Sequence, residues 1–106
     1  MSLPGASRDL LFFESRLDQY LADLSYLAGI DSGSDDKAGV DRVVDWLQAR
    51  FHSLGCAAER QPQPLLGDNL IARLRGEGGA RILLLGHSDT VYPRGMAAAR
   101  PVRIDG

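Results

Sequence analysis

Apolar residues recur every three or four positions over two stretches of the chain, and this spacing predicts two amphipathic helices. The first helix covers residues 8–28 and the second roughly residues 36–54. The apolar face of the first helix consists of Leu10, Phe13, Leu17, Leu21, Leu24 and Ala28. That of the second consists of Val40, Val43, Val44, Leu47, Phe51 and Leu54. Ser7 is the expected N-cap of the first helix, and Gly29 and Gly55 are expected to end the two helices.

The second half of the chain has the pattern of β-strands. Residues 56–60 are predicted to form a short strand, and residues 69–75 form a second one in which side chains alternate between two faces. The third predicted strand, residues 81–87, contains the continuously apolar run Ile82–Leu85. Such a run is typical of a strand that is buried on both faces.

The order of these elements predicts the fold class. The glycine-rich turn at residues 76–79 favours an antiparallel hairpin between 69–75 and 81–87, with 82–86 central in the sheet. Two helices followed by strands are typical of one half of a layered domain. We therefore expect an α/β fold with two helices packed on a small mixed sheet.

The polar stretch at residues 31–36, with the sequence Asp-Ser-Gly-Ser-Asp-Asp, has two interpretations. A calcium loop is one, but Gly33 stands where a third ligand is needed and Arg42 stands where a bidentate glutamate is needed. The other is a connecting loop that ends in the N-cap of the second helix, and we favour it.

Length, charge and cysteine content limit the function classes. The 106 residues suffice for one small domain or a piece of a larger one, and residues 1–7 are expected to be a disordered leader. The net charge is −2, with 12 basic and 14 acidic residues intermixed, so we expect no nucleic-acid binding. No apolar run approaches the length of about 18 residues needed to span a bilayer, and we expect no membrane contact. Cys56 is the single cysteine, which excludes an intrachain disulfide and favours a cytoplasmic location.

Candidate chemistry follows the apolar run. Gly86, His87, Ser88 and Asp89 come directly after it, where ligand sites of open α/β sheets collect. Side chains two residues apart on an extended chain project to the same side. Asp89 is therefore expected to accept a hydrogen bond from one nitrogen of His87, which leaves the other nitrogen free for a metal.

Less specific interpretations of the two histidines compete with a metal site. A histidine and an aspartate at this spacing are common by chance, and a lone histidine at a strand end is often only structural. A Ser-His-Asp arrangement with Ser88 or Ser53 as nucleophile lacks the Gly-x-Ser-x-Gly turn of such enzymes. His52 lies off the centre of its helix stripe and is expected to be a solvated residue.

The whole string from Ile82 to Gly95 resembles the first metal motif of the dinuclear zinc peptidases. This family includes glutamate carboxypeptidases, aminoacylases, acetylornithine deacetylases and succinyl-diaminopimelate desuccinylases. The resemblance continues in four further segments: Gly39–Leu47, Ser53–Gly55, Gly67–Ala72 and Arg100–Gly106. The sequence Asp-Thr-Val-Tyr-Pro at residues 89–93 is more similar to the glutamate carboxypeptidase branch.

This resemblance implies a zinc-dependent hydrolase of amide bonds, acting on small peptides or N-acyl amino acids. His87 is implied as a zinc ligand, and Asp89 as the active-site carboxylate that orients its imidazole. In the family, two metals bridge a water molecule, polarise the scissile carbonyl and work with a glutamate base.

The sequence departs from the family after the first motif. Asp89 and Asp105 are the only acidic residues that follow His87, so the bridging aspartate, the Glu-Glu pair and the later histidine of the family are missing. We therefore expect residues 1–106 to be an N-terminal fragment of the catalytic domain with an incomplete site for its two zinc ions. Such a fragment is expected to be inactive alone, and to self-associate or need the missing C-terminal polypeptide. The alternative is a non-catalytic α/β module that self-associates or pairs with a partner chain.

Overall fold

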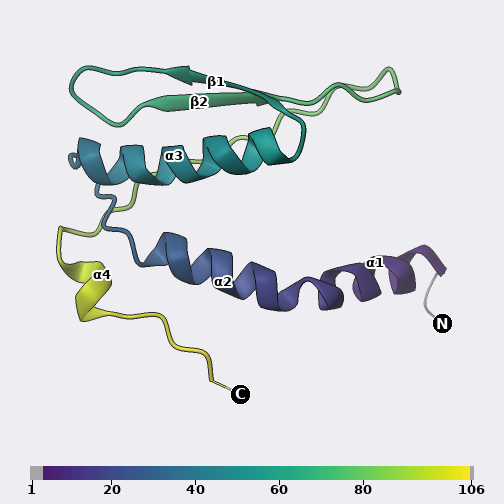
Figure 1. Cartoon of the computed structure of the whole chain (residues 1–106), viewed down its shortest axis with the longest axis horizontal. Coiled ribbons are helices and arrows are strands. Elements are labelled where there is room, and N and C mark those ends of the chain that lie inside the picture. Colours follow the sequence, from purple (N-terminus) through teal and green to yellow (C-terminus); the bar gives the residue numbers. More distant parts are fainter. Residues whose placement is uncertain (1–3, 106) are drawn as a thin grey trace.

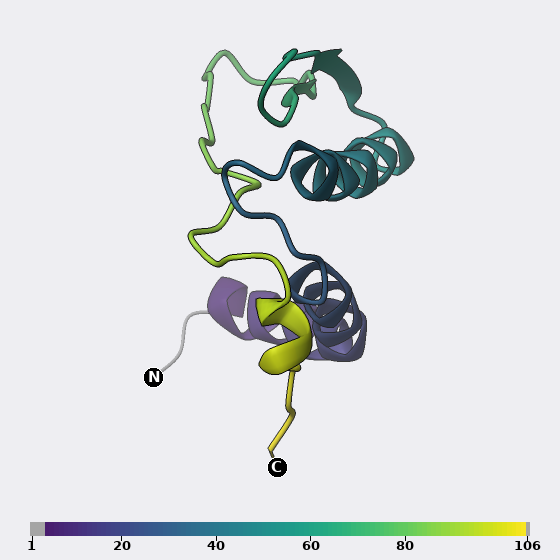
Figure 2. The same cartoon turned by 90° about the vertical axis from the view of Figure 1, so that its left-hand side faces the viewer.

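The computed structural model describes residues 4–105, while residues 1–3 and 106 lie outside the described part. Its elements in chain order are α1 (Pro4–Ser15), α2 (Leu17–Ala28), α3 (Lys37–Ser53), β1 (Ala57–Gln61), β2 (Asn69–Arg73) and α4 (Met96–Ala99). The two strands lie along one side of α3 (Figure 1). Helices α1, α2 and α4 lie on its other side (Figure 2). The α/β fold class is confirmed, and no helix of the described part is long and apolar enough to cross a bilayer.

The single helix expected over residues 8–28 is divided in two at Arg16. The backbone amide of Arg16 donates to the carbonyl of Phe13 at 3.1 Å, three residues back, and the hydroxyl of Ser15 donates to the carbonyl of Phe12 at 2.6 Å. A serine that competes for backbone carbonyls in this way interrupts helical bonding. The apolar spacing continues across the break, which is why it predicted one helix.

Helix α1 begins at Pro4, before the expected N-cap Ser7. Proline is favoured at the first helical position because it has no amide hydrogen and its φ suits a helix. Residues 4–7 of the expected leader therefore lie in α1, while the expectation of disorder stays a prediction. Its first three residues lie outside the described range.

Helix α3 agrees with its predicted bounds, and both of its ends are capped. The side chain of Asp36 accepts a hydrogen bond from the backbone amide of Gly39 at 3.1 Å. At the other end the amides of Gly55 and Cys56 bond back to carbonyls of the last turn at 3.0 Å each. Gly55 has a φ of 84°, which glycine adopts without strain. The predicted N-cap loop and the glycine stop are both confirmed.

The sheet differs from the predicted one. Strand β2 pairs antiparallel with β1, with Ala57 opposite Arg73 and Gln61 opposite Asn69. Residues 81–87 belong to no helix or strand, so their predicted pairing with 69–75 and the central position of 82–86 are wrong. The observed sheet has two antiparallel strands and is not mixed, and α3 is the helix that packs on it.

The physical reason for this difference lies in the apolar run itself. The side chains of Ile82–Leu85 are 80–88% exposed. A continuous apolar run indicates a strand only where neighbouring strands and helices cover it. No strand in residues 4–105 lies beside this run, and the small core is formed elsewhere by Ile30, Val40, Val43 and Val44.

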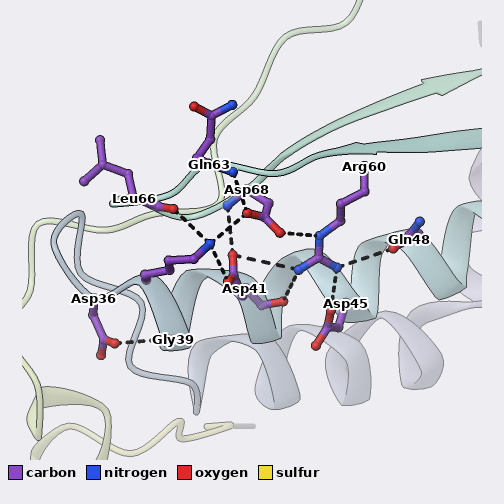
Figure 3. A network of polar contacts seen from close by, with 10 residues as sticks. Asp36, Gly39, Asp41, Asp45, Gln48, Arg60, Gln63, Leu66 and Asp68 are labelled. Atoms are coloured by element: carbon purple, nitrogen blue, oxygen red, sulfur yellow. Dashed lines mark hydrogen bonds and ion pairs between the residues drawn. The ribbon is translucent and has the colours of Figure 1, made fainter.

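A network of charged side chains attaches the loop between the strands to α3 (Figure 3). Lys37 Nζ lies 2.8 Å from Asp68 Oδ1 and 2.9 Å from Asp41 Oδ2. Arg60 Nε, on β1, lies 2.9 Å from Asp68 Oδ2, and its Nη1 lies 2.5 Å from Asp45 Oδ1. The backbone amide of Asp68 donates to Asp41 Oδ1 at 2.8 Å. Asp68 therefore connects the helix, the first strand and the loop.

Replacing Asp68 by asparagine is expected to lower the unfolding temperature by about 5 °C at neutral pH. The hydrogen bond from Lys37, followed by the backbone amide of Gln63, holds the pKa of Asp68 well below its usual range. Because this pKa is depressed in the folded state, the stabilisation is fully present above the ordinary aspartate value of about 3.9 and is lost as pH falls through the folded pKa. Melting curves of the two proteins, followed by circular dichroism, should therefore converge in acid. Glu77→Gln, in an exposed turn, is the control, and an equal effect there would contradict the role of Asp68.

Candidate functional site

The segment that carries His87 is held against the loop between α2 and α3. The amide of Thr90 donates to the carbonyl of Ser32 at 2.8 Å, and the amide of Ser34 donates to the carbonyl of Thr90 at 3.1 Å. These bonds form a parallel bridge centred on Gly33 and Thr90. A Cβ atom on Gly33 would lie 2.8 Å from the carbonyl oxygen of Tyr92, so the backbones of the two segments approach closely there.

The structure brings His87 and Asp89 together as the spacing predicts. His87 Nδ1 lies 2.8 Å from the backbone oxygen of Asp89 and 3.2 Å from its Oδ1. Both oxygens can only accept, so Nδ1 carries a hydrogen, and in the neutral imidazole Nε2 is then the nitrogen with a lone pair. The His87 side chain is 82% exposed, which leaves Nε2 accessible. The predicted geometry is present without a strand around it, while the assignment of His87 as a metal ligand and of Asp89 as an active-site residue stays a prediction.

Asp89 has a second partner that the sequence did not indicate. The hydroxyl of Ser34 donates to Asp89 Oδ2 at 2.5 Å. This bond, with a smaller contribution from His87, holds the pKa of Asp89 below its usual range. The carboxylate therefore stays ionised at neutral pH and accepts from both residues.

Asp31 and Asp36 of the 31–36 loop form hydrogen bonds and an ion pair within the protein. Asp31 accepts hydrogen bonds from the amides of Gly95 and Ala97, at 3.0 Å each, and these bonds hold its pKa below the usual value. Asp36, the N-cap of α3, also forms an ion pair with Arg94 at 3.1 Å. The loop therefore acts as a connector that holds the segment after His87, which supports the N-cap interpretation over a calcium site.

Close packing fixes this loop against α3. A Cβ atom on Gly39 would lie 1.9 Å from the backbone oxygen of Asp31, so a larger residue there would force the loop away. No local pattern marks the contacts of this loop with the segment after His87, because Asp31–Gly95, Ser34–Asp89 and Asp36–Arg94 each join residues more than 50 positions apart. Repeated aspartates and serines are also the ordinary composition of a turn.

The site offers one residue that suits a metal ion, His87, and its described residues do not form a complete metal site. Within residues 4–105 no group of three or more histidine, cysteine, aspartate or glutamate residues lies close enough to hold a metal ion. An exposed imidazole with an oriented nitrogen matches what zinc requires of a single histidine ligand. His52, the other histidine, is exposed on α3, as expected for a solvated residue.

Comparison with known proteins adds one informative match. The chain is similar to a carboxypeptidase. It is 33% identical over 104 residues to carboxypeptidase G2 of Pseudomonas sp. (strain RS-16). The match covers 93% of this chain but 25% of that protein, so the chain spans about a quarter of the length of the relative it matches. No family model matches the chain. The similarity agrees with the resemblance that residues 82–95 suggested.

Proposed function

We propose that this chain is part of the catalytic domain of a zinc-dependent metallopeptidase. Its substrates are small peptides or N-acyl amino acids, whose terminal amide bond is hydrolysed. The observation that carries the proposal is the His87 imidazole, whose Nδ1 is engaged by Asp89 and whose Nε2 is accessible. The similarity to a carboxypeptidase over nearly the whole chain supports the reaction class.

The roles of the chain's own residues follow from their contacts. Asp89 holds the hydrogen on Nδ1, so that Nε2 of His87 offers its lone pair to a metal. The ionised carboxylate also offsets positive charge that develops on the imidazole when it binds a cation. Zinc, when bound, supplies polarisation of a carbonyl group and of a water molecule. The remaining ligands and the general base come from outside the described residues.

The proposal is tested with the protein translated from the complete reading frame that contains these residues. Hydrolysis of N-acyl-glutamate and dipeptide substrates is expected with zinc, to be lost on dialysis against a chelator, and to return when zinc is restored. Magnesium is the matched control, because it binds oxygen ligands and makes little use of an imidazole. Equal activity before and after zinc removal would contradict a zinc enzyme.

We also propose that residues 1–106 self-associate when no other polypeptide covers them. The support is the apolar run Ile82–Leu85, whose four side chains are 80–88% exposed. An exposed apolar patch of this kind marks an interaction surface. This association is also the basis of the second candidate function, a non-catalytic α/β module that pairs with itself or with a partner chain.

Sedimentation analysis is expected to show dimers or larger species of residues 1–106 at high concentration. The double variant L83K/L85K should shift the protein toward the monomer, because each lysine puts a charge in the apolar surface. L65K is the control, since Leu65 is 83% exposed in a different loop. A wild-type chain that is monomeric at every concentration would contradict the proposal.

A further inference from the structure

We infer that Ser34 is a positioning residue of the site: its hydroxyl holds the Asp89 carboxylate in the orientation that engages His87. This inference rests on the proposed function for its catalytic meaning. The contact between Ser34 and Asp89 is itself an observation of the structure and does not depend on that function. Ser34 Oγ lies 2.5 Å from Asp89 Oδ2, and the other carboxylate oxygen, Oδ1, lies 3.2 Å from His87 Nδ1. The backbone oxygen of Asp89, at 2.8 Å, is the second acceptor at Nδ1.

The division of partners between the two oxygens is what gives Ser34 its role. A carboxylate can rotate about its last side-chain bond, because this torsion angle has no narrow preferred values. With Oδ2 bound to Ser34, Oδ1 remains directed at the imidazole. Since the carboxylate can only accept, the serine hydroxyl is the donor, and the bond is strengthened by the full negative charge.

Side-chain packing does not fix the orientation of Asp89 and His87. His87 is 82% exposed and Asp89 is 40% exposed, and residues 81–87 belong to no helix or strand. The orientation of the pair therefore depends on polar contacts. The main-chain bonds of Thr90 with Ser32 and Ser34 fix the path of the chain, but the Ser34 hydroxyl is the contact that reaches the carboxylate itself.

Ser34 lies in a loop that is itself fixed in position, so its hydroxyl can orient the Asp89 carboxylate. It lies 55 residues before Asp89, in a loop whose own position is fixed by the N-cap of α3 and by the contact of Asp31 with the start of α4. Its side chain is exposed, so an additional methyl group can be accommodated. Threonine should therefore replace serine, whereas alanine should not.

The first test uses nitrogen NMR of the His87 imidazole in residues 1–106, at about pH 8, where a free imidazole is neutral. Wild type is expected to have the hydrogen mainly on Nδ1. Ser34→Ala should lower the ratio of the Nδ1–H to the Nε2–H form by about three- to tenfold, because the released carboxylate can turn away and Nδ1 then loses its charge-assisted bond to Oδ1 while keeping the backbone oxygen of Asp89. Ser34→Thr should restore the wild-type ratio. Ser53→Ala, which removes a hydroxyl bonded to the carbonyl of Arg50, should leave it unchanged.

The second test uses the protein from the complete reading frame. Ser34→Ala is expected to lower kcat by about 10- to 100-fold, as for other outer partners of metal ligands, with KM nearly unchanged and with rescue by Ser34→Thr. An unchanged tautomer ratio in Ser34→Ala, or a threonine variant as impaired as the alanine variant, would overturn the inference. If the ratio changes but no zinc-dependent hydrolysis exists in wild type, the contact stands and the proposed function fails. The two claims are thereby separated.

Discussion

Replacing His87 by alanine is expected to reduce zinc-dependent amide hydrolysis by more than about 100-fold in the protein from the complete reading frame. The loss should exceed the 10- to 100-fold effect typical of residues that only support a ligand, because the metal contact itself disappears. His87 Nε2 is the one accessible imidazole nitrogen of the site, and its partner atom Nδ1 is already engaged by Asp89. Activity and bound zinc, measured on the same samples, give the readout.

His52→Ala is the matched control, because it removes the other histidine from an exposed position on α3. It should retain the activity and zinc content of wild type. Asp89→Asn should fall between the two variants, since an amide oxygen still accepts from Nδ1 but without the negative charge. Near-normal turnover of His87→Ala would exclude His87 as a zinc ligand, whatever the behaviour of the other variants.

The helices were predictable because their signals are local. An apolar residue every three or four positions, a capping aspartate and a terminal glycine act within a few residues of each other. Asp36 lies at the start of α3 and Gly55 follows its end, as the sequence indicates. The break at Arg16 was not predictable from this periodicity, because it arises from hydrogen bonds of Ser15 and Arg16 rather than from a change in the apolar spacing.

The strands illustrate the limit of the same approach. A continuous apolar run indicates that its side chains are stable when both faces of the strand are covered. The run does not indicate which residues cover them. Within residues 4–105 that cover is missing for Ile82–Leu85, whereas β2 finds its partner in β1. Residues 62–68 join β1 to β2, and both strands pack on α3. The sequence pattern alone favoured the wrong hairpin.

The candidate site divides in the same way. The pairing of His87 with Asp89 follows from a spacing of two residues and could be predicted from the sequence. Ser34, Asp31 and Arg94 meet their partners only because the loop after α2 crosses the segment after His87. Contacts over such separations depend on the fold, and no local pattern marks them.

Residues 1–106 alone are expected to show no measurable amide hydrolysis, even with excess zinc. A dinuclear mechanism requires ligands for two metals, a bridging carboxylate and a general base. Within the described residues, no cluster of three or more candidate ligands accompanies His87 and Asp89. The glutamates lie elsewhere: Glu14 in α1, Glu59 in β1 beside Arg73, and Glu77 in the turn after β2. None of them belongs to the loop at residues 31–36 or to the segment of residues 87–95, which form the site.

The assay compares purified residues 1–106 with the protein from the complete reading frame, using N-acyl-glutamate and dipeptide substrates and saturating zinc. The His87→Ala form of residues 1–106 sets the background, because it keeps every other acidic residue. Hydrolysis by residues 1–106 that depends on both zinc and His87 would contradict this prediction. It would mean that several copies of the chain assemble a complete site, since one imidazole and one carboxylate cannot hold two zinc ions. Equal background rates in both forms, with activity confined to proteins that include further ligands, is the result that the geometry of His87 and Asp89 leads us to expect.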